Sequence, residues 1–351
     1  MSDVRLSVWF WSAVFFCACI IPSPCGAADV TLRDGRVDGT NFVSIAGEIK
    51  KGDLSKVKVA SKKAILNGSE LEFILDSTGG DVDEAIAIGH FARDMLAGTF
   101  VYGTTIVLKN SEEAYEIRDL GGWSSKFVAE VEPNAAIESE FAKCYSACVL
   151  IFYGGTSKSV SSNIDYRYGF KGGKHYPVIG LHRPYFDQAK FAALTQQEAR
   201  DQYAKLEAKV RSYLHEMGTP EPVVERMFSS ASHELDLVPT GEFARYFQAK
   251  EPFLEEWIIS KCGPPGPAGA LGTDELREWQ IRDSEMQALI SGGKTKFKSM
   301  QDIDNFSTPS VSAERNLELL EKVNSHNKVW MGCNLTSIRK HQQDWALAGA
   351  P

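Results

Sequence analysis

The sequence predicts an α/β protein in which parallel strands alternate with helices. Alternating residues at Asn41–Ile49 predict a strand, helical spacing over Leu54–Leu66 predicts a helix, and Leu71–Leu75 predicts a second strand. A strand, a helix and a strand in this order form a right-handed unit with two parallel strands. With 351 residues and a hydrophobic content of 43%, the chain can bury one main core and add a smaller part.

The N-terminal residues predict export. Leu6–Ile21 is an apolar run that is short for a membrane span, and small residues follow it. This pattern predicts a signal peptide over residues 1–27, with cleavage after Ala27 or Ala28 and a periplasmic or secreted protein with no further membrane span. Because the basic region before the apolar run is weak, an uncleaved N-terminal anchor is the alternative.

Composition argues against several partners. The formal charge of −8, without a basic patch that contains aromatic residues, argues against nucleic acid. The chain has no Walker-type phosphate loop and no second pair of residues at metal-ligand spacing. The sequence therefore predicts neither a cofactor nor a metal.

Four cysteines follow the signal peptide, an even number that suits an oxidising compartment. Cys262 and Cys333 bracket the C-terminal segment and form the most natural disulfide. Cys144 and Cys148 lie on either side of Ser146. For this second pair the alternatives are metal binding, two small buried side chains, or a local disulfide, and the lack of a second ligand pair disfavours metal.

Further helices and strands follow the first unit. Residues Asp81–Ala97 predict a helix that Gly98 ends, and Thr99–Leu108 predicts a strand. The buried stripe of this helix is expected at Val82, Ala85, Ile88, Phe91 and Met95. The charged segment from about 109 to 142 predicts an insertion, as a lid, a partner-binding arm or a surface excursion.

The second half of the chain is predicted to be mainly helical. Ser157–Gly173 is polar and predicts a loop or hairpin, and a capping box at Thr195–Glu198 begins a long amphipathic helix. Shorter helices are predicted at Pro222–Phe228, Glu242–Phe247, Thr273–Leu289 and Ala313–Val323. A Gly/Pro cluster after Cys262 divides the chain into a main domain, residues 28–262, and a linker with a helical extension, residues 263–351.

Three short runs provide the residues for acyl-transfer chemistry. A strand ends in Asp76–Gly80, a serine lies between small residues at Cys144–Cys148, and a third strand ends at His182. In chain order these runs supply a glycine turn for an oxyanion, a hydroxyl nucleophile and a base.

These runs resemble the Clp protease proteolytic subunit and its periplasmic Clp-like relatives, within the ClpP/crotonase superfamily. The resemblance covers roughly Asn41–Phe247, and the order of the three runs is more specific than any one of them. It implies a spiral of strand–helix–strand units and a long handle helix after the histidine. It also implies packing of subunits into a homo-oligomer, whereas an amphipathic helix lying on its own domain fits the spacing equally well.

The expected site has four members and an uncertain fifth. Ser146 is the predicted nucleophile and His182 the base, with backbone N–H groups of Gly80 and Ala147 as oxyanion donors. The alternative for Ser146 is a small residue chosen for close packing.

The third member of a catalytic triad is where the chain departs from the family pattern. An ungapped comparison places the acid at Leu235, which cannot act as one, so its neighbour Glu234 is the candidate and Asp236 the alternative. Without either carboxylate, Ser146 and His182 form a slower dyad.

The sequence as a whole predicts a secreted serine hydrolase, most simply a peptidase acting on peptide or protein substrates. A catalytically inactive scaffold or binding protein of the same fold is the first alternative. A crotonase-type acyl-CoA enzyme is the second, and export argues against it because acyl-CoA is cytosolic.

Overall fold

The computed structural model describes the residues in the following ranges: 27–34, 41–68, 70–101, 105–109, 116–118, 136–140, 142–160, 163–164, 175–176, 179–185, 194–230, 234–238, 252–292 and 308–349. The predicted signal peptide, except for Ala27, and the predicted helix at Glu242–Phe247 lie outside these ranges.

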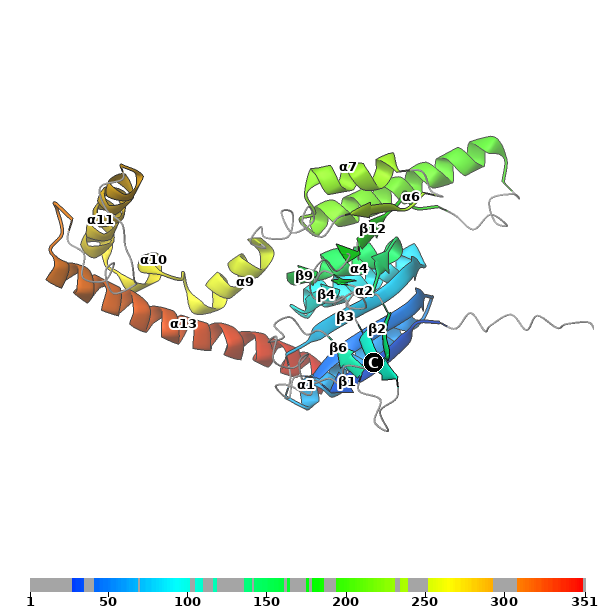
Figure 1. The fold of residues 1–351 in the computed structure, drawn as a ribbon, viewed down its shortest axis with the longest axis horizontal. Coiled ribbons are helices and arrows are strands. Elements are labelled where there is room, and N and C mark those ends of the chain that lie inside the picture. Colours follow the sequence, from blue (N-terminus) through cyan, green and yellow to red (C-terminus); the bar gives the residue numbers. More distant parts are fainter. Residues whose placement is uncertain are drawn as a thin grey trace, which may run out of the picture.

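Among the described residues, eight strands form the main sheet of a mixed α/β fold (Figure 1). The main path runs β1-β2-β3-β8-β12-β13, and beside it β4 pairs with β3 and β9 pairs with β4. The strands are β1 Asp29–Asp34, β2 Asn41–Ile49, β3 Glu72–Gly80, β4 Gly98–Val101, β8 Cys144–Tyr145, β9 Ser157–Val160, β12 Ile179–Leu181 and β13 Asp236–Val238. Strands β2, β3, β8 and β12 are mutually parallel, as the predicted strand–helix–strand units require.

Strand β3 changes its partner along its length. Its first half pairs with β4 from Glu72 to Ile74, whereas its second half pairs with β8 at Ser77. The predicted strand ended at Leu75, but the structure continues it through Gly80. The strand therefore carries its two terminal glycines to the place where β8 ends.

Helices α1, Asp53–Leu66, and α2, Val82–Asp94, connect β2 to β3 and β3 to β4. The helix predicted to end at Gly98 is shorter than expected. Met95 caps α2 and Leu96 adopts a positive φ of 53°, so the chain turns before Gly98, which begins β4. The single strand predicted at Thr99–Leu108 is likewise wrong, because it is divided between β4 and β5 of a different sheet.

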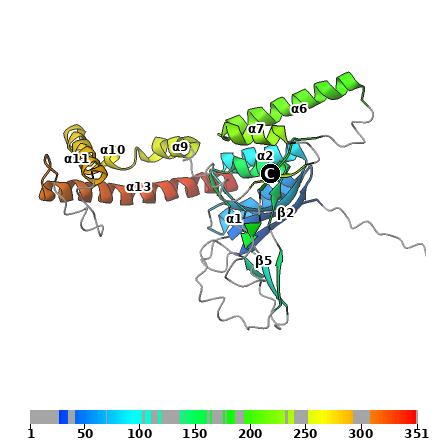
Figure 2. The ribbon, with the colours of Figure 1, turned by 45° about the horizontal axis from the view of Figure 1, so that its top comes forward.

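Two strands of the predicted insertion, β6 and β7, pair with β5 in a small antiparallel sheet in which β5 lies between them (Figure 2). These strands are β5 Thr105–Lys109, β6 Glu116–Arg118 and β7 Ala136–Glu140. Within the predicted loop or hairpin, β9 joins the main sheet, and β10 Asn163–Ile164 pairs with β11 His175–Tyr176, which lies just beyond it.

Two further helices lie over α2 and α4, which is the helix Ala147–Gly154 (Figures 1 and 2). The long helix α6, Gln196–Glu216, begins with the predicted capping box, and α7, Glu221–Ser229, follows it. The Tyr213 hydroxyl of α6 donates to the carbonyl of Leu150 in α4 at 2.8 Å. Helix α6 therefore packs on its own domain through at least one buried contact.

The C-terminal helices form an arm that projects from the main sheet and returns to it (Figures 1 and 2). They are α9 Pro252–Cys262, α10 Pro267–Ala270, α11 Thr273–Ser291 and α13 Ala313–Leu347. The helix predicted to end at Val323 continues to Leu347. Its last turns pack against the domain, where the rings of Trp345 and Phe91 lie 5.2 Å apart. None of the described helices is both long and apolar enough to cross a membrane.

Candidate active site

Ser146 lies on a sharp turn between β8 and α4. Its backbone has φ 56° and ψ −125°, a conformation that non-glycine residues rarely adopt. The Ser146 N–H donates to the carbonyl of Gly180 in β12 at 3.0 Å, and the Ser146 carbonyl accepts from Val149 of α4 at 3.0 Å. The serine is thus held between the sheet and the first turn of the helix, as the sequence predicted for a helix start.

Gly79 makes room for this turn. A Cβ at Gly79 would lie 2.6 Å from the Cβ of Ser146 and 3.0 Å from the amide nitrogen of Ala147. Gly79 also has a φ of 102°, a backbone conformation that residues other than glycine rarely adopt. Glycine at this position therefore allows the end of β3 to lie directly against the serine turn.

The pairing of Gly80 with β2 places its N–H on the side of β3 that faces away from β2. Gly80 is the ladder partner of Ile49 in β2, and it is the next residue, Asp81, that donates to the Ile49 carbonyl at 2.8 Å. In a parallel ladder in which the residue after Gly80 donates to Ile49, the N–H of Gly80 itself faces away from β2. On that side of β3 lies β8, which leads into Ser146.

His182 follows β12 directly, at the same edge of the sheet as Ser146. Its Nδ1 lies 3.0 Å from the carbonyl oxygen of Arg183. A carbonyl can only accept, so this contact requires a proton on Nδ1 and leaves Nε2 of the neutral ring as an acceptor. The ring of Tyr185 lies 5.5 Å from that of His182.

Ser146 and His182 line one groove of about 1220 Å³. Most of its other lining residues come from the ends of β2 and β3, the start of α2 and the segment after β12: Glu48, Ile49, Lys50, Lys51, Thr78, Gly79, Gly80, Asp81, Val82, Asp83, Pro184, Tyr185 and, from α6, Leu206. The structure thus brings the serine, the histidine and the glycine turn together. Ala147 lies beside them as the first residue of α4, where a helix has N–H groups without helical partners.

Neither candidate acid lines this groove. Asp236 pairs in register with Leu181, but its carboxylate accepts from Arg226 Nε at 2.5 Å and Nη2 at 2.9 Å. These hydrogen bonds hold the pKa of Asp236 below its ordinary value. Glu234 is exposed before β13. Among the described residues, neither carboxylate hydrogen-bonds to His182, and the carbonyl of Arg183 takes that place.

Two residues support the site in ways that the sequence did not indicate. Asp76 accepts from the Lys143 N–H at 3.1 Å and so ties β3 to the start of β8. Burial, followed by the negative charge of Asp76, raises the pKa of Tyr145, the residue before Ser146. Asp76 belongs to the Asp-Ser-Thr-Gly-Gly run, and its position within a recognised motif was the available signal.

The four cysteines in the described ranges form two disulfides. One joins Cys262 of α9 to Cys333 of α13, and the other joins Cys144 to Cys148 across Ser146. Of the three alternatives left open for the second pair, the structure has the local disulfide. No group of three His, Cys, Asp or Glu side chains in the described ranges is placed to hold a metal ion.

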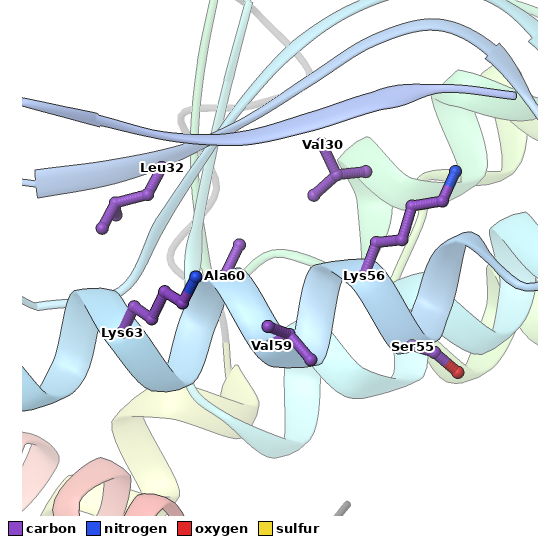
Figure 3. A pocket seen from close by; sticks show the side chains of 7 residues that line it. All are labelled: Val30, Leu32, Ser55, Lys56, Val59, Ala60 and Lys63. Carbon is purple, nitrogen blue, oxygen red and sulfur yellow. The ribbon is translucent and has the colours of Figure 1, made fainter. Parts of the chain in front are cut away.

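A second hollow of about 410 Å³ lies between β1 and α1 (Figure 3). Apolar side chains of both elements and two lysines line it, namely Val30, Leu32, Val59, Ala60, Lys56 and Lys63, together with Ser55. None of these residues lines the groove of Ser146, so the hollow is separate from the candidate site.

No family model matches the chain, and no curated protein matches it in sequence. One solved structure that resembles it is a mutant of a membrane-bound stomatin-specific protease. The resemblance has a TM-score of 0.34 and 13% sequence identity, and it covers 63% of this chain and 83% of that one.

Proposed function

We propose that the protein is a serine hydrolase of the Clp-like type, acting on peptide or protein substrates through an acyl-enzyme at Ser146. The observation that supports this most is the shared groove. There, a serine on a strained strand-to-helix turn lies with a histidine whose Nδ1 is 3.0 Å from the Arg183 carbonyl and with the glycine end of β3. The same kind of turn exposes the nucleophile in unrelated serine hydrolases.

In the proposed mechanism, His182 Nε2 takes the proton of Ser146 Oγ as the oxygen attacks a substrate carbonyl. The N–H groups of Gly80 and Ala147 stabilise the negative oxygen of the tetrahedral intermediate. Protonated His182 then gives its proton to the leaving amine, and water reverses these steps to release the acid. No cofactor is assigned a part in this chemistry.

The orientation of His182 by a backbone carbonyl has a consequence for rate. A neutral carbonyl fixes the tautomer of the ring but stabilises the imidazolium less than a carboxylate does. The proposed enzyme therefore works as a dyad and more slowly than a full triad. The same observation favours the second candidate function, an inactive scaffold of the same fold, which the labelling experiment below distinguishes.

Three finer features belong to this proposal. The domain, residues 28–262, adopts the Clp-like spiral and its long helix α6 packs subunits into a homo-oligomer. Residues 263–351 form an extension, and residues 1–27 direct the chain to the periplasm or outside the cell. Light scattering of the mature chain tests self-assembly, and a monomeric mass at micromolar concentration contradicts that feature alone.

Labelling with a fluorophosphonate tests the proposed nucleophile. The mature wild type is expected to label on one serine, Ser146→Ala not at all, and His182→Ala about a hundredfold more slowly, since general-base catalysis contributes that order of rate. Ser55→Ala, on α1 outside the groove, serves as the matched control and keeps the wild-type rate. If the folded wild type fails to label, or Ser146→Ala labels equally, the hydrolase proposal is wrong.

A further inference from the structure

The Cys144–Cys148 disulfide closes a loop of five residues with Ser146 at its centre. Cys144 belongs to β8 and pairs with both Ser77 of β3 and Ile179 of β12. Cys148 is the second residue of α4. The bridge therefore ties the last strand before the serine to the first turn of the helix after it.

Ser146 needs such a tie because its backbone conformation is unfavourable by itself. A serine at φ 56° and ψ −125° persists only where its surroundings fix it. Two neighbouring elements contribute: the carbonyl of Gly180 accepts from the Ser146 N–H, and Gly79 lies against the Ser146 side chain. Both act from outside the turn, whereas the disulfide restrains its two ends directly.

We propose that the Cys144–Cys148 disulfide is a positioning element that holds Ser146 in its positive-φ conformation. The oxidised chain then has an assembled nucleophile, and the reduced chain keeps its core but loses the geometry of the turn. The inference rests on the proposed hydrolase function for its effect on reactivity, but its effect on the backbone stands independently.

Position distinguishes this bridge from the other one. Cys144 and Cys148 are both 0% exposed and belong to the main core, whereas Cys262 and Cys333 are partly exposed on the C-terminal arm. Opening either bridge takes two electrons and two protons. A dithiol such as dithiothreitol supplies them as it closes to its cyclic disulfide, and both cysteines become thiols. Mild reduction should open the exposed bridge first.

The test compares two double variants, Cys144→Ala/Cys148→Ala and the matched control Cys262→Ala/Cys333→Ala. For each, fluorophosphonate labelling gives the maximal inactivation rate and the half-saturating concentration, and amide hydrogen exchange is followed at residues 145–149 and in β2 and β3. The first variant should lose about a hundredfold in maximal rate, with half-saturation unchanged, because a nucleophile displaced by about 1 Å costs that order of rate.

Hydrogen exchange supplies a readout that loss of overall stability cannot imitate. The first variant should exchange faster at residues 145–149 but not in β2 and β3, and the control variant should match the wild type at both places. Wild type reduced with dithiothreitol should behave as the first variant does, and oxidised glutathione should restore it. This reduction experiment also tests the proposal if the first variant does not fold.

The outcomes separate the two proposals. If the first variant labels at close to the wild-type rate, or if the maximal labelling rate falls equally in both double variants, the disulfide does not position Ser146. The hydrolase proposal is unaffected by either result. If the wild type does not label, the hydrolase proposal fails. Exchange then decides: faster exchange confined to residues 145–149 supports positioning, and unchanged or uniform exchange overturns it.

Discussion

His182 and Asp236 lie close in the sheet but serve different partners. The chain pairs Asp236 with Leu181, the residue before His182, yet directs its carboxylate to Arg226. A bidentate Arg–carboxylate pair satisfies both oxygens, so little remains for the histidine to gain from Asp236. Asp236 is therefore a structural residue that joins α7 to β13.

Replacing Asp236 by Asn should lower stability without changing reactivity. The pKa of Asp236 is depressed from 3.8 in the folded chain, so its contribution is fully present above that value and is lost as the pH falls through the folded pKa. Urea unfolding at pH 7 should show a loss of about 1 kcal/mol, the upper range for a partly exposed pair. At pH 3 or below, the free energies of unfolding of the variant and the wild type should become more similar.

The double variant Asp236→Asn/Arg226→Gln serves as the control. Once Arg226 has been replaced, Asp236→Asn should cause little further loss of unfolding free energy. Fluorophosphonate labelling by Asp236→Asn should proceed at the wild-type rate. A tenfold slower reaction in a fully folded variant would show instead that Asp236 acts on His182.

The residues of the candidate site could be nominated from sequence because they occur in short local runs. Ser146, His182 and the two glycines each stand at the end of a strand, and parallel strands bring such ends to one edge. Side-chain contacts between separate elements could not be derived in this way. The Arg226–Asp236 pair depends on how α7 lies against β13, which no spacing in the chain records.

At the scale of elements, the end of β3 connects the fold to the site. Gly79 and Gly80 continue the strand at φ values of 102° and 140°, where any other residue is strained. A Cβ at Gly80 would lie 2.1 Å from the Ile49 carbonyl oxygen, whereas a Cβ at Gly79 would meet the serine turn. The missing side chain of Gly79 therefore makes room for the serine turn, and the missing side chain of Gly80 makes room for the pairing with β2.

Replacing Gly79 by Ala should slow labelling of Ser146, because the added methyl group displaces the turn. Gly52→Ala is the matched control: Gly52 has a similar φ of 98°, but a Cβ there meets nothing within 4 Å. Gly52→Ala should lose about 1 kcal/mol in urea unfolding from backbone strain, and Gly79→Ala should lose more because its methyl group also meets the serine turn. Only Gly79→Ala should label more slowly, by about tenfold or more. Equal labelling rates in the two variants would contradict the close contact between β3 and the turn.

Hydrophobic spacing predicted where most elements begin better than where they end. It placed α1 and β2 within a residue, and the capping box gave the start of α6. The end of α2 was wrong because Leu96 turns the chain through its own positive φ, although leucine gives no sign of it. Helix α13 was predicted too short because its polar middle interrupts the apolar spacing, while a disulfide and the domain surface hold it helical.

At the scale of the whole molecule, the helices of the arm are joined to one another, and the end of α13 is anchored on the domain. The Cys262–Cys333 bridge joins α9 to α13, and Lys322 and Arg315 of α13 pair with Glu275 of α11. The far end of α13 returns to the domain, where the His341 ring lies 2.7 Å from the Asp94 carbonyl. The sequence predicted an extension joined by a linker, but not its return, because that return depends on a few side chains at α13's last turns.

Gln342 is the most specific of these anchors. Its side chain is 1% exposed, accepts from the Leu71 N–H at 3.2 Å and donates to the Met95 carbonyl at 2.9 Å. One amide thus satisfies the backbone just before β3 and the cap of α2. Gln342→Ala should leave both groups buried and unpaired, at a cost of about 3 kcal/mol in urea unfolding.

The neighbouring Gln343 supplies the control, because it is exposed on the same turn of α13 and its replacement by Ala should cost about 0.5 kcal/mol or less. Amide exchange at Leu71 should quicken in Gln342→Ala alone. Leu71 leads into β3, whose other end carries Gly79 and Gly80, so docking of the arm and the geometry of the groove share one strand. If Gln342→Ala and Gln343→Ala lose equal amounts of unfolding free energy, or if exchange at Leu71 is unchanged in Gln342→Ala, the arm does not dock through the Gln342 amide.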